Sequence, residues 1–217
     1  MNDEPVLARI RLNPHSRDVQ RDLRDATDMH RTVMRMVPDG LGDSPRCRAG
    51  LLYRLDETDT TSTLLVQAAN RLDPARLPAG YGQADIKSLT PMFTALRRGL
   101  AVRYRIVLNP AKRERLPLEA KGKRGRVMPL SGADADRWWL RRAADAGLQV
   151  HVMTPTNMPP IRPRRQDPDG MRHTLIRYDG TATVTDPDAL HGAVLTGIGR
   201  GKPYGAGLLS LAPAPAA

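Results

Sequence analysis

The sequence predicts a mixed α+β chain built from two tandem units, each with the element order βαββαβ. A strand pattern that stops at Asn-Pro occurs twice, at residues 8–14 and again at residues 103–110. Each copy precedes a segment of helical periodicity and then shorter alternating segments. The chain length of 217 residues suits two domains of about 100 residues each. We therefore predict domains at residues 1–95 and 96–217.

The first unit opens with a strand at residues 8–12, where apolar and polar residues alternate until Asn13-Pro14 ends the pairing. A helix follows, capped by Asp25 or Thr27 and continuing to Val37, before a Pro-Asp-Gly stop. The apolar residues at helical spacing that we expect to face the core are Met29, Val33, Met36 and Val37. The remaining predicted elements are two strands, a helix start and a strand, at residues 51–55, 63–68, 73–74 and 86–89.

The second unit repeats this order more loosely. Its opening strand is followed by a basic segment and then by a helix that starts at Ser131 and stops at Gly147. Asp179-Gly180 predicts a hairpin turn between two strands. The later predicted elements are strands at residues 148–153, 174–178, 181–185 and 207–211, and a helix from Asp186-Pro187. In both units the order is that of a ferredoxin-like (RRM-like) fold.

The charge of the chain points to a polyanionic partner. Lys and Arg number 34 against 23 Asp and Glu, a formal net charge of +11. Residues 1–99 contribute only +2 of this charge, and residues 100–217 contribute +9. Such a concentration favours nucleic acid as the partner. The alternative is a basic surface without a specific ligand.

Composition also excludes several classes of protein. The one cysteine, Cys47, excludes an internal disulfide framework and a cysteine-based zinc site. No stretch of 18 apolar residues is present, and the first 14 residues lack the apolar segment of a signal peptide. We expect a cytoplasmic protein that makes no membrane contact.

A glycine-rich run at residues 197–207 carries two cations, Arg200 and Lys202. It is not a Walker A loop, because Thr196 and Pro203 occupy positions where that motif needs Gly and Ser or Thr. It also follows a predicted helix and precedes a strand, the reverse of the nucleotide-binding motifs. A backbone that a ligand can approach closely suits a phosphodiester. The alternative is a tight helix-to-strand connection.

The run Gly-Ile-Gly-Arg-Gly-Lys-Pro-Tyr-Gly-Ala-Gly-Leu-Leu-Ser at residues 197–210 resembles the C-terminal signature of the CasE family, the CRISPR repeat endoribonucleases of type I-E systems. Further segments resemble that family in the same order along the chain: Leu12-Asn13-Pro14, Arg21-Asp22-Leu23, Asp28-Met29-His30-Arg31-Thr32, Asn109-Pro110-Ala111-Lys112-Arg113 and Lys121-Gly122-Lys123-Arg124. The resemblance implies tandem ferredoxin-like domains. It also implies an endonuclease that cleaves pre-crRNA without metal at the base of a repeat stem-loop and then stays on the crRNA in a Cascade complex with other subunits.

Cleavage without a metal uses the 2′-hydroxyl of the RNA as nucleophile, so the protein supplies an acid, a base and cations. His30 matches the catalytic histidine of the family, and an imidazole moves protons near neutral pH. Family members carry a tyrosine three residues earlier, where this chain has Thr27. A threonine hydroxyl is too weak an acid to replace a phenol. Either His30 works largely alone, or Tyr204 or Lys202 substitutes, or cleavage is slow. No metal or other cofactor is expected.

The expected RNA contacts are cationic residues, two glycines and one tyrosine. They lie beside the histidine, in the mid-chain basic segment, in a proline-rich loop at residues 154–172 and in the glycine-rich run: Arg31, Arg35, Lys112, Arg113, Lys121, Lys123, Arg124, Arg126, Arg162, Arg164, Arg165, Gly199, Arg200, Gly201, Lys202 and Tyr204. Trp138 and Trp139 diverge by about 100° on their predicted helix, so we expect one of them in the core.

The sequence is also compatible with two functions other than RNA cleavage. The first is a non-catalytic repeat-binding subunit of the same fold, which Thr27 suggests. The second is a basic scaffold that mainly contacts proteins. Binding dominated by phosphates weakens steeply with salt, which separates the scaffold from the two RNA-binding functions.

Overall fold

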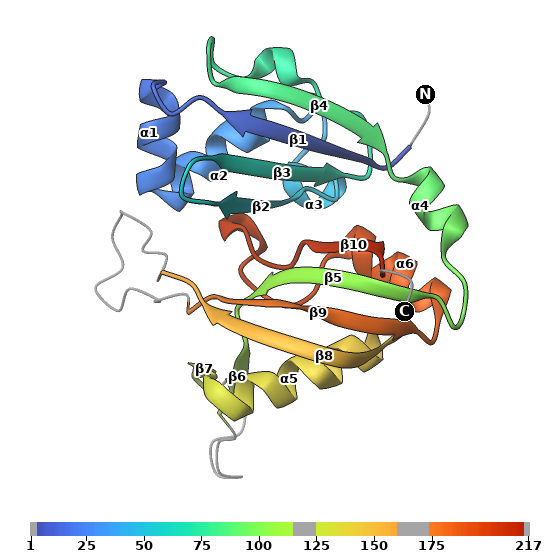
Figure 1. Ribbon diagram of the computed structural model, residues 1–217. Coiled ribbons are helices and arrows are strands. Elements are labelled where there is room, and N and C mark those ends of the chain that lie inside the picture. Colours follow the sequence, from blue (N-terminus) through green and yellow to red (C-terminus); the bar gives the residue numbers. More distant parts are fainter. Residues whose placement is uncertain (1–3, 115–124, 160–173, 215–217) are drawn as a thin grey trace.

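The computed structural model describes residues 4–114, 125–159 and 174–214. Its framework is a pair of four-stranded antiparallel sheets with the orders β2-β3-β1-β4 and β10-β5-β9-β8 (Figure 1). The strands of the first sheet are β1 (Val6–Leu12), β2 (Leu52–Glu57), β3 (Ser62–Ala68) and β4 (Gly82–Ser88). The strands of the second are β5 (Ala101–Leu108), β8 (Leu148–Asn157), β9 (Ile176–Val184) and β10 (Leu209–Pro213). Each sheet has the ferredoxin-like order, which confirms the predicted fold.

The helices of the two units differ. After β1 the chain forms three helices, α1 (Arg17–Arg24), α2 (Ala26–Arg35) and α3 (Pro45–Arg48), where the sequence predicted one. The second crossover of this unit holds only a 3₁₀ turn, η1 (Pro74–Arg76). The helix α4 (Thr90–Ala95) leads to the second unit. The helices in the described part of that unit are α5 (Gly132–Asp145), α6 (Pro187–Thr196) and the 3₁₀ turn η3 (Lys202–Tyr204). None of the helices described is long and apolar enough to cross a membrane.

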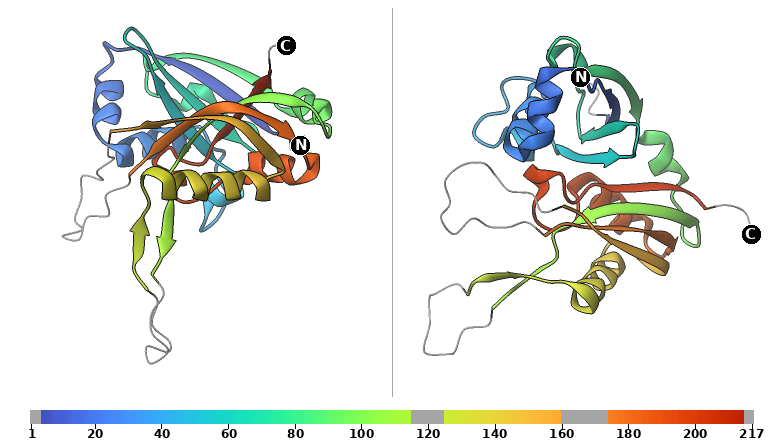
Figure 2. Two further views of the ribbon diagram at one scale, coloured as in Figure 1. Left: turned by 60° about the horizontal axis from the view of Figure 1, so that its bottom comes forward. Right: turned by 60° about the vertical axis from the view of Figure 1, so that its left-hand side comes forward.

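The two ends of the basic mid-chain segment pair with each other as the strands of a β-hairpin. β6 (Ala111–Arg113) pairs with β7 (Val127–Pro129), and the hairpin projects away from the sheets (Figure 2). The sequence analysis named only a basic segment here and assigned it no strand, because two strands of three residues are too short for their alternation to be recognised. Residues 115–124 within it lie outside the described part of the chain.

The sequence repeat has a structural meaning. β1 and β5 occupy the same position in their sheets, between the third and fourth strands of each unit. Asn13, after β1, donates from its side-chain amide to the carbonyl of Gly80, just before β4 (3.0 Å). Asn109, after β5, forms a β-bridge with Arg200, on the approach to β10. In both units, therefore, the Asn-Pro step joins the end of the first strand to the segment that leads into the fourth.

Each unit has its own apolar core. The predicted stripe of α2 is buried, with Met29, Val33, Met36 and Val37 at 4% exposure or less. In the second unit both Trp138 and Trp139 are buried, so the expectation that only one belongs to the core is wrong. Trp139 packs between Tyr104 and Tyr178 of the sheet. Trp138 lies under the glycine-rich run, against Gly199.

The predicted hairpin at Asp179-Gly180 is also wrong, because β9 runs straight through it. Asp179 pairs with Arg105 of β5 in the ladder, and their side chains form an ion pair at 2.5 Å. Gly180 faces a bulge in β8, where a Cβ atom would lie 1.9 Å from the carbonyl oxygen of Val152. The glycine therefore permits a close approach of two strands, and pairing on both sides of β9 overrides the local turn preference.

The two sheets meet through β2 and β3 of the first unit. Arg54 is 2% exposed and holds Asp56 through two hydrogen bonds of 2.9 and 3.0 Å. Its third nitrogen donates to the carbonyls of Arg105 and Leu208 in the second unit, both at 3.2 Å. Gln67 on β3 donates to the carbonyl of Val194 in α6 (2.7 Å). Buried polar groups of one sheet are thus satisfied by the backbone of the other.

We predict that Arg54→Ala lowers the free energy of unfolding by about 3–5 kcal/mol. It removes the donor to two carbonyls of the interface and leaves Asp56 with only the longer ion pair to Arg105 (3.8 Å). Urea unfolding followed by circular dichroism measures this. The matched control is Arg9→Ala, which removes an exposed ion pair with Asp85 (3.3 Å) and should cost less than about 1 kcal/mol. Equal losses in the two variants would contradict a special role for Arg54.

Gly197 ends α6 at φ 72° and ψ 158°, a region that only glycine adopts freely. A Cβ atom there would lie 2.7 Å from Leu52 of β2. Gly197→Ala should therefore destabilise the protein by about 1–3 kcal/mol. Gly192→Ala is the control, because Gly192 lies within α6 with open space around it, and alanine there should stabilise by about 0.5–1 kcal/mol. Thermal melting should give a lower midpoint temperature for Gly197→Ala and a higher one for Gly192→Ala than for the wild type.

Candidate active site at the junction of the two sheets

The helix that carries the predicted catalytic histidine is fixed at its start and along one face. Asp25 caps α2 by accepting a hydrogen bond from the backbone N–H of Thr27 (2.8 Å). Met29 and Val33 anchor the helix in the core. His30 follows Met29 by one residue and is half-buried at the edge of that face. Its buried Nδ1 has no hydrogen-bond partner among the described residues, so the described part of the protein does not hold the ring through this nitrogen.

Tyr53 connects His30 to the glycine-rich run of the second unit. The two rings stack with centroids 6.4 Å apart. The Tyr53 hydroxyl donates a hydrogen bond to the carbonyl of Pro203 within η3 (2.7 Å). Burial, above all, raises the pKa of Tyr53, so the phenol stays protonated. Its proton is committed to a carbonyl, so Tyr53 orients the loop and does not take the place of the family's tyrosine.

The turn η3 contacts both α2 and β2. It therefore brings Lys202 and Tyr204 of the second unit to the helix of His30. Such a position is what one of the three alternatives requires, the one in which Tyr204 or Lys202 substitutes for the family's tyrosine. Thr27 lies one helical turn before His30 on α2 and is half-buried. Only the folding of the chain joins residues that are 172 positions apart in the sequence, His30 and Lys202.

The electrostatics of this junction involve a third cation, Arg46 of α3. Burial lowers the pKa of His30 below its ordinary value, and the charge of Arg46 lowers it further. Burial likewise lowers the pKa of Lys202, again with a contribution from Arg46. Arg46 is held by the carbonyl of Leu51 (3.4 Å) and by the sulfur of Cys47 (2.9 Å). The shifts keep His30 neutral near pH 7 and make Lys202 a stronger acid.

Sequence reasoning missed Arg46 and Tyr53. Arg46 lies in a short four-residue helix with no motif around it. Tyr53 belongs to a predicted strand and looks like an ordinary core residue, which it also is, at 3% exposure. No local pattern marks either one, because both acquire their roles from contacts between distant segments.

The other predicted RNA-binding residues are distributed over several elements. Arg31 and Arg35 are exposed on α2, and Arg31 pairs with Asp28 (3.1 Å). Lys112 and Arg113 belong to β6, and the exposed Arg126 immediately precedes β7. Six others lie outside the described residues: Lys121, Lys123, Arg124, Arg162, Arg164 and Arg165.

The glycine-rich run forms a tight helix-to-strand connection, from α6 through η3 to β10. Gly199 and Gly201 have φ angles of 81° and 79° and pack against Trp138 and Asn109. The structure therefore supports the packing role of these glycines that the sequence left as an alternative. Arg200 is exposed beside them, so a cation remains at the surface of the connection.

Comparison with known proteins gives consistent results. A family model described as CRISPR associated protein matches residues 6–213. The CRISPR-associated endoribonuclease Cse3 of Thermus thermophilus is 31% identical over 220 residues, which cover 95% of this chain and 99% of the relative. The Cascade subunit CasE of Escherichia coli strain K12 is 26% identical over 88% of this chain and 93% of its own length. A structure of Thermus thermophilus Cse3 bound to an RNA representing a pre-cleavage complex has a TM-score of 0.79 and 30% identity, over 97% of this chain and 100% of that one.

The environment of His30 predicts its titration. Its imidazole should titrate below about 6.5 in the folded protein, and Arg46→Ala should raise that pKa only part of the way, because burial is the larger cause. NMR titration of the ring protons measures both values, with the urea-unfolded chain as reference. Because folding lowers this pKa, His30 should make the folded state less stable as the pH falls below the unfolded value. A folded pKa at or above the unfolded one would contradict this environment.

Proposed function

The chain belongs to the CasE family of CRISPR-associated repeat endoribonucleases, and from that membership we propose how it acts on RNA. The protein binds a CRISPR repeat stem-loop, cleaves pre-crRNA at the base of the stem and remains on the crRNA within Cascade, in contact with other subunits. The observation that supports this most directly is the half-buried His30, whose ring stacks on Tyr53 beside the cationic loop of Lys202. We place this activity in the cytoplasm.

The reaction is a transesterification that needs no metal. The 2′-oxygen bonds to the adjacent phosphorus, and the bond from phosphorus to the 5′-oxygen breaks. The products are a 2′,3′-cyclic phosphate and a 5′-hydroxyl. Neutral His30 accepts the proton of the 2′-hydroxyl, and its lowered pKa keeps it in the basic form at neutral pH.

The leaving 5′-oxygen needs a proton, and Lys202 is the donor that we propose in place of the family's tyrosine. Its lowered pKa eases proton donation, and its position in η3 places it next to α2. Arg46 supplies fixed positive charge for the phosphorane. In this mechanism Thr27 takes no part in proton transfer. It lies in the first turn of α2, where its backbone N–H donates to the capping Asp25.

Binding of the stem involves both units. We assign the catalytic histidine to a domain at residues 1–95, and the basic hairpin and glycine-rich run to a domain at residues 96–217. Arg31 and Arg35 would contact phosphates near the cut. Lys112, Arg113 and Arg126 would contact phosphates farther along the stem, since A-form RNA is recognised mainly through its backbone and shape. For the six basic residues outside the described part, contact with RNA phosphates stays a prediction from the sequence.

The expected result is that purified protein cleaves a labelled repeat stem-loop in EDTA, and that His30→Ala lowers the single-turnover rate by about 10²- to 10⁴-fold. Lys202→Ala should also slow cleavage, since it removes the proposed acid. A 2′-deoxy nucleotide at the cut site should abolish cleavage, because the nucleophile is absent. Gel analysis of the products measures all three effects.

His15→Ala serves as the matched histidine control, because His15 is exposed beyond β1. Tight, salt-sensitive binding without cleavage would support the non-catalytic alternative that Thr27 suggests. Weak binding to free stem-loops would favour the protein scaffold instead.

A further inference from the structure

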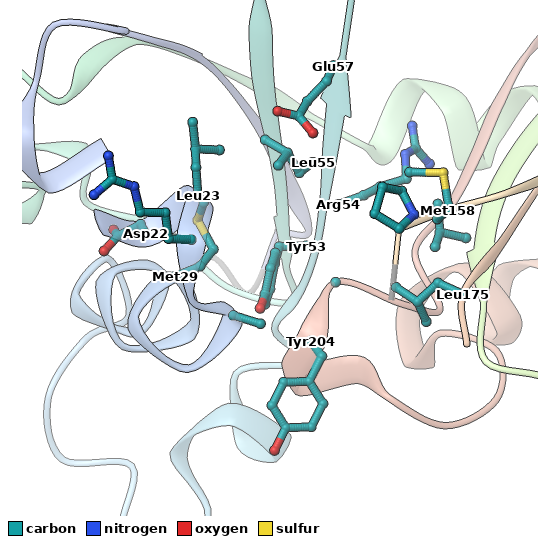
Figure 3. A pocket seen from close by; sticks show the side chains of 15 residues that line it. Asp22, Leu23, Met29, Tyr53, Arg54, Leu55, Glu57, Met158, Leu175 and Tyr204 are labelled. Atoms are coloured by element: carbon teal, nitrogen blue, oxygen red, sulfur yellow. The ribbon is translucent and has the colours of Figure 1, made fainter. Parts of the chain in front are cut away.

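A mainly apolar pocket of about 370 Å³ lies beside the candidate active site (Figure 3). Leu23 and Met29 from α1 and α2 line one side, and Tyr53 and Leu55 of β2 lie between them and the opposite wall. That wall is formed by residues of the second unit, among them Met158, Leu175 and Tyr204. The pocket therefore lies where the two units meet, and both contribute to it.

The pocket and the catalytic groups share structural elements. Met29 precedes His30 directly in α2. Tyr53 lines the pocket and also stacks on the His30 ring. Tyr204 ends the same short turn that carries Lys202. His30 and Lys202 do not themselves line the pocket, but a group that occupies it would contact Met29, Tyr53 and Tyr204, which adjoin them in sequence or by stacking.

Two of the charged residues lining the pocket are already satisfied by the protein. Asp22 accepts hydrogen bonds from the Tyr81 hydroxyl (2.8 Å) and from Arg21. Arg54 is committed to Asp56 and to the interface carbonyls. The exposed side chains of Arg24 and Glu57 remain at the margin. An apolar interior with polar groups at its edge suits a flat heterocycle with polar edges.

The reaction itself requires such a group. In a regular A-form strand the 2′-hydroxyl is not in line with the bond that breaks, so the nucleotide at the cut must rotate out of the stack. Unstacking costs a few kcal/mol unless the protein receives the base. Unpaired RNA bases are commonly held against aromatic and apolar side chains. At about 370 Å³ the pocket is near the lower end of ligand sites, a size that suits one base.

We propose that this pocket binds the unstacked nucleobase of a nucleotide that flanks the scissile phosphate, and so holds the linkage in line for cleavage. The inference rests on the proposed function, because it takes the substrate to be RNA cut beside His30. A side chain of a neighbouring protein subunit is the competing occupant. The shared walls with the catalytic site favour the base.

The first test combines substrate and protein changes in single-turnover cleavage. Repeat RNAs carry an abasic nucleotide immediately 5′ or 3′ of the cut, and Leu23→Trp fills the pocket from an exposed position (37%). One abasic RNA should be cleaved roughly tenfold more slowly by the wild type. Leu23→Trp should slow cleavage of the intact RNA by a similar factor and slow the abasic RNA no further. Ile86→Trp is the matched control, since Ile86 is 36% exposed and lies on the edge strand β4.

A second measurement does not depend on cleavage. The methyl groups of Met29 and Met158, which line the pocket, are observed by NMR with a non-cleavable 2′-deoxy repeat RNA. A base in the pocket should shift both signals by its ring current. The matching abasic RNA should not, and Met92, which lies on α4 and does not line the pocket, serves as the reference methyl.

The outcomes separate the two hypotheses. Cleavage of intact and abasic RNAs at equal rates, with unchanged methyl signals, would overturn the pocket proposal and leave the endonuclease function standing. Base-dependent methyl shifts without cleavage of intact RNA would support the pocket and overturn the catalytic function. Methyl shifts produced by another Cascade subunit, and not by the base, would assign the pocket to a protein side chain and refute the proposal.

Discussion

The arrangement of the site depends on two consecutive side chains of β2 that both bind the second unit. Tyr53 donates to the carbonyl of Pro203, and Arg54 donates to the carbonyls of Arg105 and Leu208. Successive residues of a strand point to opposite faces, so the strand is fixed to the second unit on both sides. This fixation places η3 against α2. Together with the bond from Gln67 to Val194, it defines the position of Lys202 relative to His30.

The fixation gathers partly buried nitrogen bases and cations at one place. His30 and Lys202 both lose solvation there, and Arg46 disfavours the charged form of each. Further positive charge at this site is unfavourable because the cations repel one another, and a bound phosphate would offset that repulsion. An anionic RNA backbone therefore gains more from this junction than from an exposed cluster of Lys and Arg. In the cleavage proposed above, the phosphorane of the transition state carries additional negative charge, which the same groups would stabilise further.

The repeated architecture divides the work between its two copies. An Asn-Pro step follows the first strand of each unit, and its Asn bonds to the segment that precedes the fourth strand of that unit. In the first copy that segment is only a connection to β4. In the second copy it is the glycine-rich run, which reaches the other unit through Gly197 and the turn η3. The basic hairpin of β6 and β7 is likewise an addition to the second copy. The two units thus share a similar sheet, and the hairpin and the glycine-rich run occur in the second unit.

The sequence by itself determined the elements that local pattern specifies. Alternation and Asn-Pro located β1 and β5, helical spacing identified the buried face of α2, and resemblance identified His30. Tertiary structure alone decided where local signals compete with long-range pairing. Asp179-Gly180 has the local chemistry of a turn, yet pairing with β5 and β8 keeps β9 extended. Tyr53, Arg46 and the pocket beside them have no signal in the sequence, because their surroundings come from distant segments. Tyr53 and Pro203, for example, are 150 residues apart. A contact of that kind depends on the packing of two sheets, which no window of neighbouring residues encodes.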